Sequence, residues 1–202
     1  DNSVFKPHTD SREIEGVKRK YKIVGKYIFY LGTLEPRKNI SRIIEAFASL
    51  RAQEQINRKL VLAGEKGWLY SDIFHKVEKL DLEKDVIFTG YVPQQDLPIL
   101  MSGADMFVYP SLYEGFGLPP LEAMACRTPV ITSNVSSLPE VVGDAGILVN
   151  PYSADEIAKA IYQVLSNGEL RQRMRQKGFE RAKLFSWEKA ALQTLKVFQS
   201  IS

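Results

Sequence analysis

The sequence has few of the residues that usually build metal or redox sites, with one cysteine and two histidines among 202 residues. The single Cys126 excludes an intrachain disulfide and a cysteine-cluster metal site, and its apolar neighbours favour a small core residue. His8 and His75 are too few and too isolated for a metal site or a histidine-based catalytic triad. We therefore expect neither kind of chemistry.

Long apolar runs and one-sided charge are also missing. No stretch approaches the roughly 18 residues of a membrane span, and no secretory signal opens the chain, so a cytoplasmic protein is expected. The net charge is only +3, and no Lys/Arg stripe with interleaved aromatics indicates nucleic acid as a partner. The basic run from Arg171 to Lys177 predicts a solvated helix face, with peripheral contact to anionic lipid at the inner face of a membrane as the alternative.

Short apolar runs alternate with amphipathic segments along the chain. Continuous apolar runs suit parallel strands covered on both faces, and apolar residues repeating at three and four indicate helices. The pattern predicts a doubly wound, Rossmann-like α/β fold, with a six-stranded parallel sheet, helices on both faces and extra C-terminal helices. Strands are expected at 27–31, 59–63, 86–89, 106–109, 130–132 and 146–149, with helices at 39–53, 70–80 and 94–102 and from 121, 153 and 186 onward.

Two acids, Glu114 and Glu122, bracket the turn between the fourth strand and the next helix. Gly115 and Gly117 allow the backbone to adopt positive φ there and to come close to a ligand, and Pro119 or Pro120 suits the first helical position. The helix N-terminus would attract an anion, phosphate above all, while each carboxylate would accept hydrogen bonds from the vicinal hydroxyls of a sugar. A ligand with a central diphosphate and a polyol at either end would satisfy the whole turn.

The spacing of seven residues between Glu114 and Glu122, with the Gly-Phe-Gly turn between them, resembles the Glu-x7-Glu motif of a known family. This family is the retaining glycosyltransferases of the glycogen-synthase and mannosyltransferase type, and the resemblance to it covers nearly the whole chain. It implies one half of a GT-B fold, the C-terminal half that binds the donor. Residues 1–20 would then be an interdomain lead-in, 21–185 the nucleotide-sugar domain, and 186–202 a helix that packs on a missing N-terminal domain.

The resemblance also implies roles for single residues. Glu114 would contact the hydroxyls of the transferred sugar, and Glu122 would bind the ribose diol. Lys38 and Arg37 would hold the diphosphate and stabilise the leaving group, with Arg37 replacing an arginine that many members carry where this chain has Thr33. The backbone positions expected to border the donor are Gly32, Gly90, Tyr91, Val92, Gly115, Phe116, Gly117 and Leu118.

Base recognition is expected from backbone groups beside the crevice, at Gly64 and Gly90 among others. Trp68 and Tyr91 could stack on the base, although packing explains large aromatic residues in such loops equally well. Because Asp-x-Asp occurs nowhere in the sequence, the resemblance implies transfer without a metal or another cofactor.

The function implied is transfer of a hexose from a nucleotide diphosphate sugar to an acceptor hydroxyl with retention of configuration. The segment from Gly32 to Asn39 resembles members that use GDP-mannose, so GDP is favoured over UDP. A sugar or a lipid-linked glycan would be the acceptor. Because catalysis in this architecture takes place between two domains, the chain alone is expected to bind donor more readily than it turns donor over.

Two other classes remain as alternatives. A Rossmann-type oxidoreductase shares the fold class, but Pro120 occupies the third position of what would be Gly-x-Gly-x-x-Gly. A non-catalytic binding module would not need a glycine turn that is flanked by two acids and faced by a basic pair.

Overall fold

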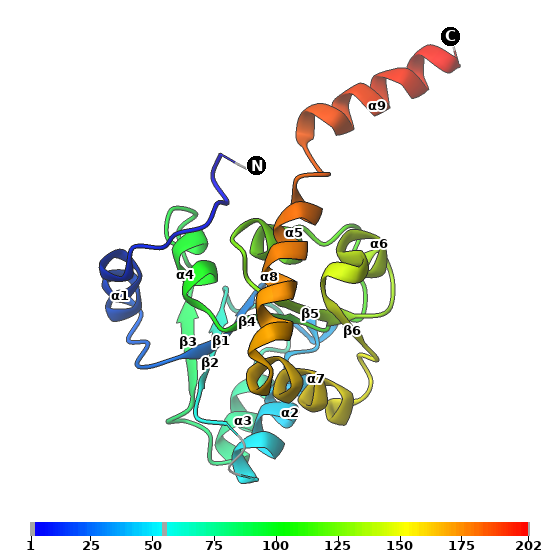
Figure 1. The fold of residues 1–202 in the computed structure, drawn as a ribbon. Coiled ribbons are helices and arrows are strands. Elements are labelled where there is room, and N and C mark those ends of the chain that lie inside the picture. The colour runs from blue at the N-terminus through cyan, green and yellow to red at the C-terminus, as the bar shows by residue number, and fades with distance from the viewer. Residues whose placement is uncertain (1–2, 54–55, 202) are drawn as a thin grey trace.

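The computed structural model describes residues 3–53 and 56–201 and contains a parallel sheet of six strands in the order β3-β2-β1-β4-β5-β6. Helices cover both faces of this sheet (Figure 1). The prediction of a doubly wound sheet is confirmed. The strands are β1 (Tyr27–Leu31), β2 (Lys59–Ala63), β3 (Val86–Gly90), β4 (Met106–Tyr109), β5 (Val130–Ser133) and β6 (Ile147–Val149).

The helices follow the strands in the expected alternation. They are α1 (Ser11–Lys20), α2 (Ile40–Ala52), α3 (Ser71–Lys79), α4 (Leu97–Gly103), α5 (Leu118–Ala125), α6 (Leu138–Val142), α7 (Ala154–Ser166), α8 (Gly168–Ala182) and α9 (Trp187–Ser200), with short 3-10 helices η1 (Pro36–Lys38) and η2 (Gly143–Ala145). The one-turn elements α6, η1 and η2 were not predicted, because segments this short show no apolar periodicity.

The strand order reverses between β1 and β4, which lie side by side at the centre of the sheet. Both strands are apolar throughout, and residues 27–30 and 106–109 are all fully buried. The chain leaves β1 towards β2 and β3, and it leaves β4 towards β5 and β6. The loops after β1 and β4 therefore diverge, and in folds of this kind the crevice between them binds ligands.

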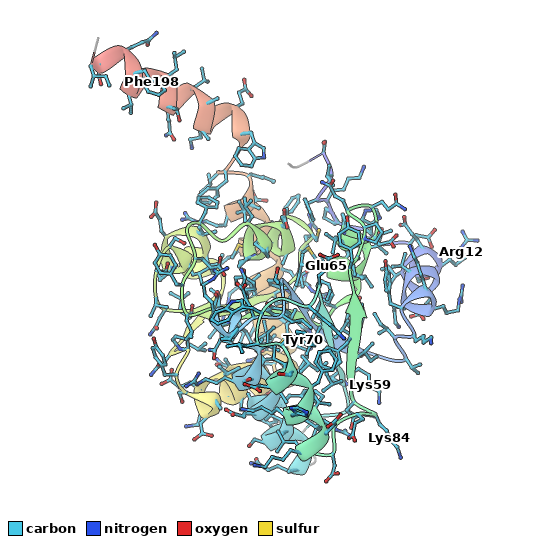
Figure 2. All side chains as sticks on the ribbon, turned by 180° about the vertical axis from the view of Figure 1, so that it is seen from behind. Arg12, Lys59, Glu65, Tyr70, Lys84 and Phe198 are labelled. Carbon is cyan, nitrogen blue, oxygen red and sulfur yellow. The ribbon has the colours of Figure 1, made fainter. Side chains whose placement is uncertain are left out.

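Different side chains lie at the amino ends and at the carboxyl ends of the strands. At the amino ends of the strands, the Lys59 ammonium donates to the Lys84 carbonyl at 2.8 Å, and Figure 2 shows this pair at one end of the domain. Glu65 follows the carboxyl end of β2 and lies away from Lys59 and Lys84, above them in Figure 2. The loops after β1, β2, β3 and β4 therefore lie at the carboxyl ends of the strands.

The segment 1–20, predicted to be an interdomain lead-in, contains the helix α1, which was not predicted. Asp10 caps this helix by accepting the Arg12 amide at 2.8 Å, and α1 packs on α4. Ile14 of α1 packs closely against Gly103 of α4, since a Cβ added at Gly103 would lie 2.7 Å from the Ile14 methyl carbon Cγ2. The sequence signal was weak because only a narrow stripe of this short, charged helix is apolar.

The last helix, α9, projects away from the rest of the domain, and none of its residues is buried (Figure 1). Ser186 caps it as predicted, accepting the Lys189 amide at 3.1 Å. Its apolar side chains, among them Leu195 and Phe198, are exposed (Figure 2). Packing of this helix on an N-terminal domain stays a prediction.

Asn39 holds three loops of the carboxyl edge together. Its backbone is left-handed, with φ of 61°, and its side chain is buried. The amide nitrogen donates to the carbonyl of Pro110 at 2.8 Å and to that of Pro151 at 2.7 Å. These bonds tie the loop after β1 to the loops after β4 and β6, so Asn39 fixes the position of the neighbouring Lys38.

We expect Asn39→Ala to destabilise the fold by about 2–4 kcal/mol, because two buried carbonyls lose their donor and alanine is strained in the left-handed region. Urea unfolding of the variant would measure this loss. The matched control is Asn134→Ala, at an exposed asparagine, which should change the free energy of unfolding by no more than about 0.5 kcal/mol. Equal effects of the two substitutions would show that Asn39 does not tie the loops together.

Candidate functional site

The loops after β1 and β4 are bonded to each other at the switch point of the sheet. The Leu112 amide donates to the Arg37 carbonyl at 2.9 Å, and the Arg37 guanidinium donates back to the Tyr113 carbonyl at 2.7 Å. The side chains of both loops are thereby brought to one place. Arg37, Lys38 and Glu114, predicted as functional residues from separate segments, lie together there.

The Glu114 carboxylate is the centre of this cluster, and its side chain is only 11% exposed. One oxygen, Oε1, accepts from the Lys38 ammonium at 2.7 Å, the Ser111 hydroxyl at 2.7 Å and the Tyr109 hydroxyl at 2.8 Å. The other oxygen, Oε2, lies 3.2 Å from Arg37 Nη1. Burial disfavours the charged form of Glu114, but the hydrogen bonds from these groups outweigh it and lower its pKa.

Both cations of the cluster are paired with carboxylates. Lys38 is as buried as Glu114, whereas the Arg37 side chain is 41% exposed and bridges Glu114 and Glu35, with Nη2 2.7 Å from the Glu35 carboxylate. An anion that entered the crevice would therefore compete with Glu114 for both cations.

The turn that follows Glu114 leads directly into α5. Gly117 precedes the helix with φ of 114°, and a Cβ there would lie 2.7 Å from Leu138, so glycine is required. Gly115 does not use the conformational freedom of glycine, because its φ is not positive and a Cβ there would meet nothing within 4 Å. Ser137 fixes the turn instead, donating to the Phe116 carbonyl at 2.6 Å. The helix begins at Leu118, so Pro119 occupies its second position, and the prediction that Pro119 or Pro120 would be the first helical residue is wrong by one position.

Glu122 lies apart from the Glu114 cluster, on the second turn of α5. It lines a small cavity of about 60 Å³ together with apolar residues of α5 and apolar residues from both ends of the chain. Burial raises the pKa of this carboxyl group above its ordinary value. Its neighbours there are Phe5, Leu118, Leu121, Ala125, Phe185 and Trp187.

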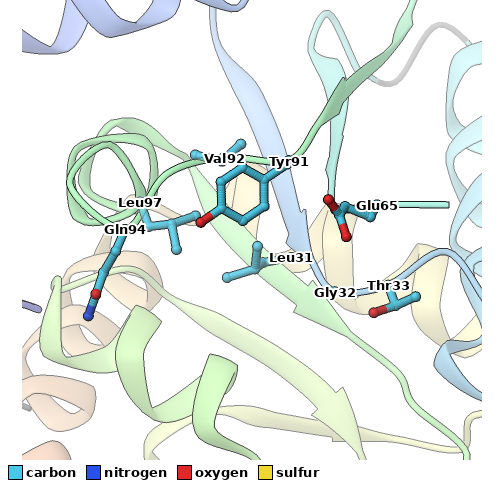
Figure 3. A pocket seen from close by; sticks show the side chains of 9 residues that line it. Leu31, Gly32, Thr33, Glu65, Tyr91, Val92, Gln94 and Leu97 are labelled. Atoms are coloured by element: carbon cyan, nitrogen blue, oxygen red, sulfur yellow. The ribbon is translucent and has the colours of Figure 1, made fainter. Parts of the chain in front are cut away.

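A second cavity, of about 280 Å³, opens at the carboxyl ends of β1, β2 and β3 (Figure 3). Gly64 allows two loops to meet beside it, because a Cβ at that position would lie 2.0 Å from the Gly32 carbonyl oxygen. Thr33 lines this cavity, whereas Trp68, which is 64% exposed, does not. Gly90 ends β3, and its carbonyl accepts the Gly64 amide at 2.9 Å. The full lining is Leu31, Gly32, Thr33, Gly64, Glu65, Tyr91, Val92, Gln94 and Leu97.

Sequence reasoning missed the hydroxyl groups that surround Glu114. Tyr109 was interpreted only as part of a buried strand, and Ser111 only as part of the motif. A signal was available for Tyr109, because a tyrosine at the buried end of a strand needs a partner for its hydroxyl, and the nearest loop carries acids. Asn39 had no comparable signal, since its two acceptors are distant in sequence.

Within residues 3–53 and 56–201, no three His, Cys, Asp or Glu side chains gather in a way that could hold a metal ion. Over these residues, no helix has the length and apolar character needed to span a bilayer. The lone Cys126 is buried, as predicted, and burial raises the pKa of its thiol to about 12.

A doubly wound sheet with a basic and acidic cluster at its switch point defines an α/β domain of the nucleotide-binding type. Residues 12–181 match the model of the family Glycosyl transferases group 1, and the chain belongs to this family. Its fold is one half of a GT-B glycosyltransferase. This result favours the glycosyltransferase prediction over the oxidoreductase and the binding module.

Relatives and solved structures agree with this assignment. O-antigen chain mannosyltransferase B of Escherichia coli is 44% identical over 184 residues, which cover 91% of this chain and 48% of that protein. The C-terminal domain of the group 1 protein LpcC of Francisella tularensis has 30% identity and a TM-score of 0.78, over 91% of this chain and 96% of that domain. HepE of Anabaena, solved with UDP-glucose, shares the fold at 22% identity and a TM-score of 0.86, over 99% of this chain and 55% of its own. The chain spans about half or less of the length of the curated relatives that it matches.

The pH dependence of stability tests the Glu114 cluster. The pKa of Glu114 lies below its ordinary value of 4.5 in the folded chain, so its charge stabilises the fold above about pH 4.5 and loses this contribution as the pH falls through the folded pKa. Glu114→Gln should remove this part of the acid sensitivity. At neutral pH it should also destabilise the fold by about 3 kcal/mol, because Lys38 loses its ion-pair partner.

Urea unfolding between about pH 3 and pH 7 would measure both effects. Glu188→Gln, at an exposed glutamate in the first turn of α9, is the matched control and should leave the pH profile unchanged. A profile for Glu114→Gln that runs parallel to the wild-type profile would contradict the ion-paired state of Glu114.

Proposed function

We propose that this chain is the donor-binding half of a retaining hexosyltransferase, with mannose from GDP-mannose as the favoured donor. One observation carries the proposal: the cluster of Arg37, Lys38 and Glu114 opens at the same edge of the sheet as the 280 Å³ cavity. A nucleotide sugar has a base at one end, a diphosphate in the middle and a polyol at the other end. The two features offer complementary groups to all three parts.

The diphosphate would bind at Arg37 and Lys38. When the bond between the sugar and phosphate breaks, the nucleoside diphosphate leaves with added negative charge, which positioned cations stabilise. In the structure both cations contact Glu114. As they turn to the diphosphate, Glu114 gains free acceptor sites for the hydroxyls of the sugar. The backbone from Gly115 to Leu118 would border the same groups.

The base would occupy the cavity at the ends of β1, β2 and β3. Tyr91 offers an exposed ring for stacking, and Glu65 offers a carboxylate that could accept from the N–H groups of guanine (Figure 3). GDP is preferred over UDP because the Escherichia coli relative at 44% identity is a mannosyltransferase. Glu122 is the proposed ligand of the ribose diol.

The acceptor, a sugar or a lipid-linked glycan, would be bound with the help of an N-terminal domain. The exposed apolar face of α9 supports contact with such a domain, since its side chains have no core of their own to enter. The basic run on α8 supports a solvated face more than a lipid contact, because Lys177 pairs with Asp144 at 2.6 Å and Met174 is buried. Transfer by this chain alone should be weak or absent.

Calorimetric titration with GDP, UDP, ADP and NAD would test the donor site. We expect saturable binding of one nucleoside diphosphate, GDP above UDP. Lys38→Ala and Glu122→Ala should each weaken it about 10- to 100-fold, the effect of losing one charge-assisted hydrogen bond. Lys159→Ala, at an exposed lysine on α7, is the control and should bind as the wild type does.

The pattern of binding separates the competing outcomes. Tighter binding of UDP than GDP would overturn the choice of GDP-mannose and leave the donor site in place. Binding of NAD alone, or equal binding by wild type and Lys38→Ala, would overturn the proposed site.

A further inference from the structure

The Tyr109 hydroxyl lies between the two oppositely charged groups of the site. It accepts a hydrogen bond from Lys38 Nζ at 2.6 Å and donates one to Glu114 Oε1 at 2.8 Å. Since Lys38 Nζ also lies 2.7 Å from the same carboxylate oxygen, the three groups form a closed triangle. A hydroxyl can take part in such a triangle because it donates and accepts at once.

We propose that Tyr109 is a positioning residue, whose hydroxyl sets the geometry of Lys38 and Glu114 and retains Glu114 when Lys38 turns to the diphosphate of the donor. This inference rests on the proposed function for the identity of the ligand. The contacts that define the triangle are independent of it.

The ring of Tyr109 cannot move easily. It is fully buried at the end of β4, a central strand, and stacks on Tyr30 and Phe107 with centroids 5.9 and 5.8 Å apart. Lys38, by contrast, carries its charge on a flexible chain of four carbons. The hydroxyl is therefore the fixed member of the triangle, and the ammonium is the member that can change partner.

The hydroxyl also keeps its proton. Burial raises the pKa of Tyr109 above its ordinary value, and the neighbouring charge of Glu114 raises it further. Tyr109 therefore remains a hydrogen-bond donor at neutral pH. When Lys38 leaves, Glu114 Oε1 still has two donors, Tyr109 and Ser111; without the tyrosine hydroxyl it would have one.

The charged and titratable groups around Glu114 come from two elements. Arg37 and Lys38 reach it from the loop after β1, with Glu35 attached through Arg37, and Tyr109 reaches it from β4. Tyr30 lies behind Tyr109 on β1. None of the other groups occupies the position between Lys38 and Glu114.

Tyr30 provides a matched control. It is as buried as Tyr109 and stacks on it, but its hydroxyl makes only a long contact, 3.4 Å, to the Thr33 carbonyl. Tyr109→Phe and Tyr30→Phe thus remove the same atom from neighbouring buried rings, and only the first removes it from the triangle.

The first measurement is the pKa of Glu114, from carbon NMR of the carboxyl group, assigned with Glu114→Gln. The pKa should rise in Tyr109→Phe, because a hydrogen bond to the charged form is lost, and should stay at the wild-type value in Tyr30→Phe. The second is the ratio of GDP to guanosine affinity by calorimetry. It should fall about three- to tenfold in Tyr109→Phe alone, since only the diphosphate depends on the triangle.

Each outcome decides the inference. An unchanged Glu114 pKa in Tyr109→Phe, or equal changes in both variants, would overturn it, because the effect would then be absent or due to packing. A pKa change without a change in the affinity ratio would overturn the role in donor binding. If the wild type binds neither GDP nor another nucleoside diphosphate, the proposed function fails, and the pKa comparison by itself still decides whether Tyr109 holds Lys38 and Glu114.

Discussion

The ion pair between Lys38 and Glu114 joins the two loops that leave the centre of the sheet in opposite directions. Strand order alone would bring these loops near each other, but it would not fix their side chains. Asn39 holds the backbone beside Lys38, and Ser137 holds the turn after Glu114. The cluster is therefore supported from both sides by bonds between segments distant in sequence, and its geometry depends on the complete fold.

A buried ion pair is costly to form, because both partners leave water and only good geometry with further hydrogen bonds compensates. Here Tyr109 and Ser111 supply those bonds on Glu114. The arrangement keeps two cations in the crevice without exposing uncompensated charge. A diphosphate would exchange one anionic partner for another, which costs less than bringing unpaired cations together when the ligand arrives.

Much of the architecture was readable from the sequence, for physical reasons. Strands buried on both faces must be continuously apolar, so 27–31 and 106–109 were found with their observed bounds. The capping serine at residue 186 was found because its role is local. The helix α1 within the first 20 residues was not predicted, because most of this short helix is polar.

The charged residues of the candidate site could be predicted from the sequence, whereas its neutral hydrogen-bonding groups could not. Arg37, Lys38 and Glu114 were predicted because charged residues in the loops that follow buried strands indicate a binding site. The hydroxyl of Tyr109 does not stand out in an apolar strand, and only the structure shows that the ring points it between two charges. Glu122 is the opposite case, because the sequence reveals the residue and does not reveal its surroundings. The motif identifies this acid, but the cavity beside it is lined by residues of α5 and by residues from both ends of the chain, among them Phe5 and Trp187. Because burial raises the pKa of this carboxyl group, the packing of these residues from distant parts of the chain bears on whether Glu122 is ionised, which the local motif does not determine.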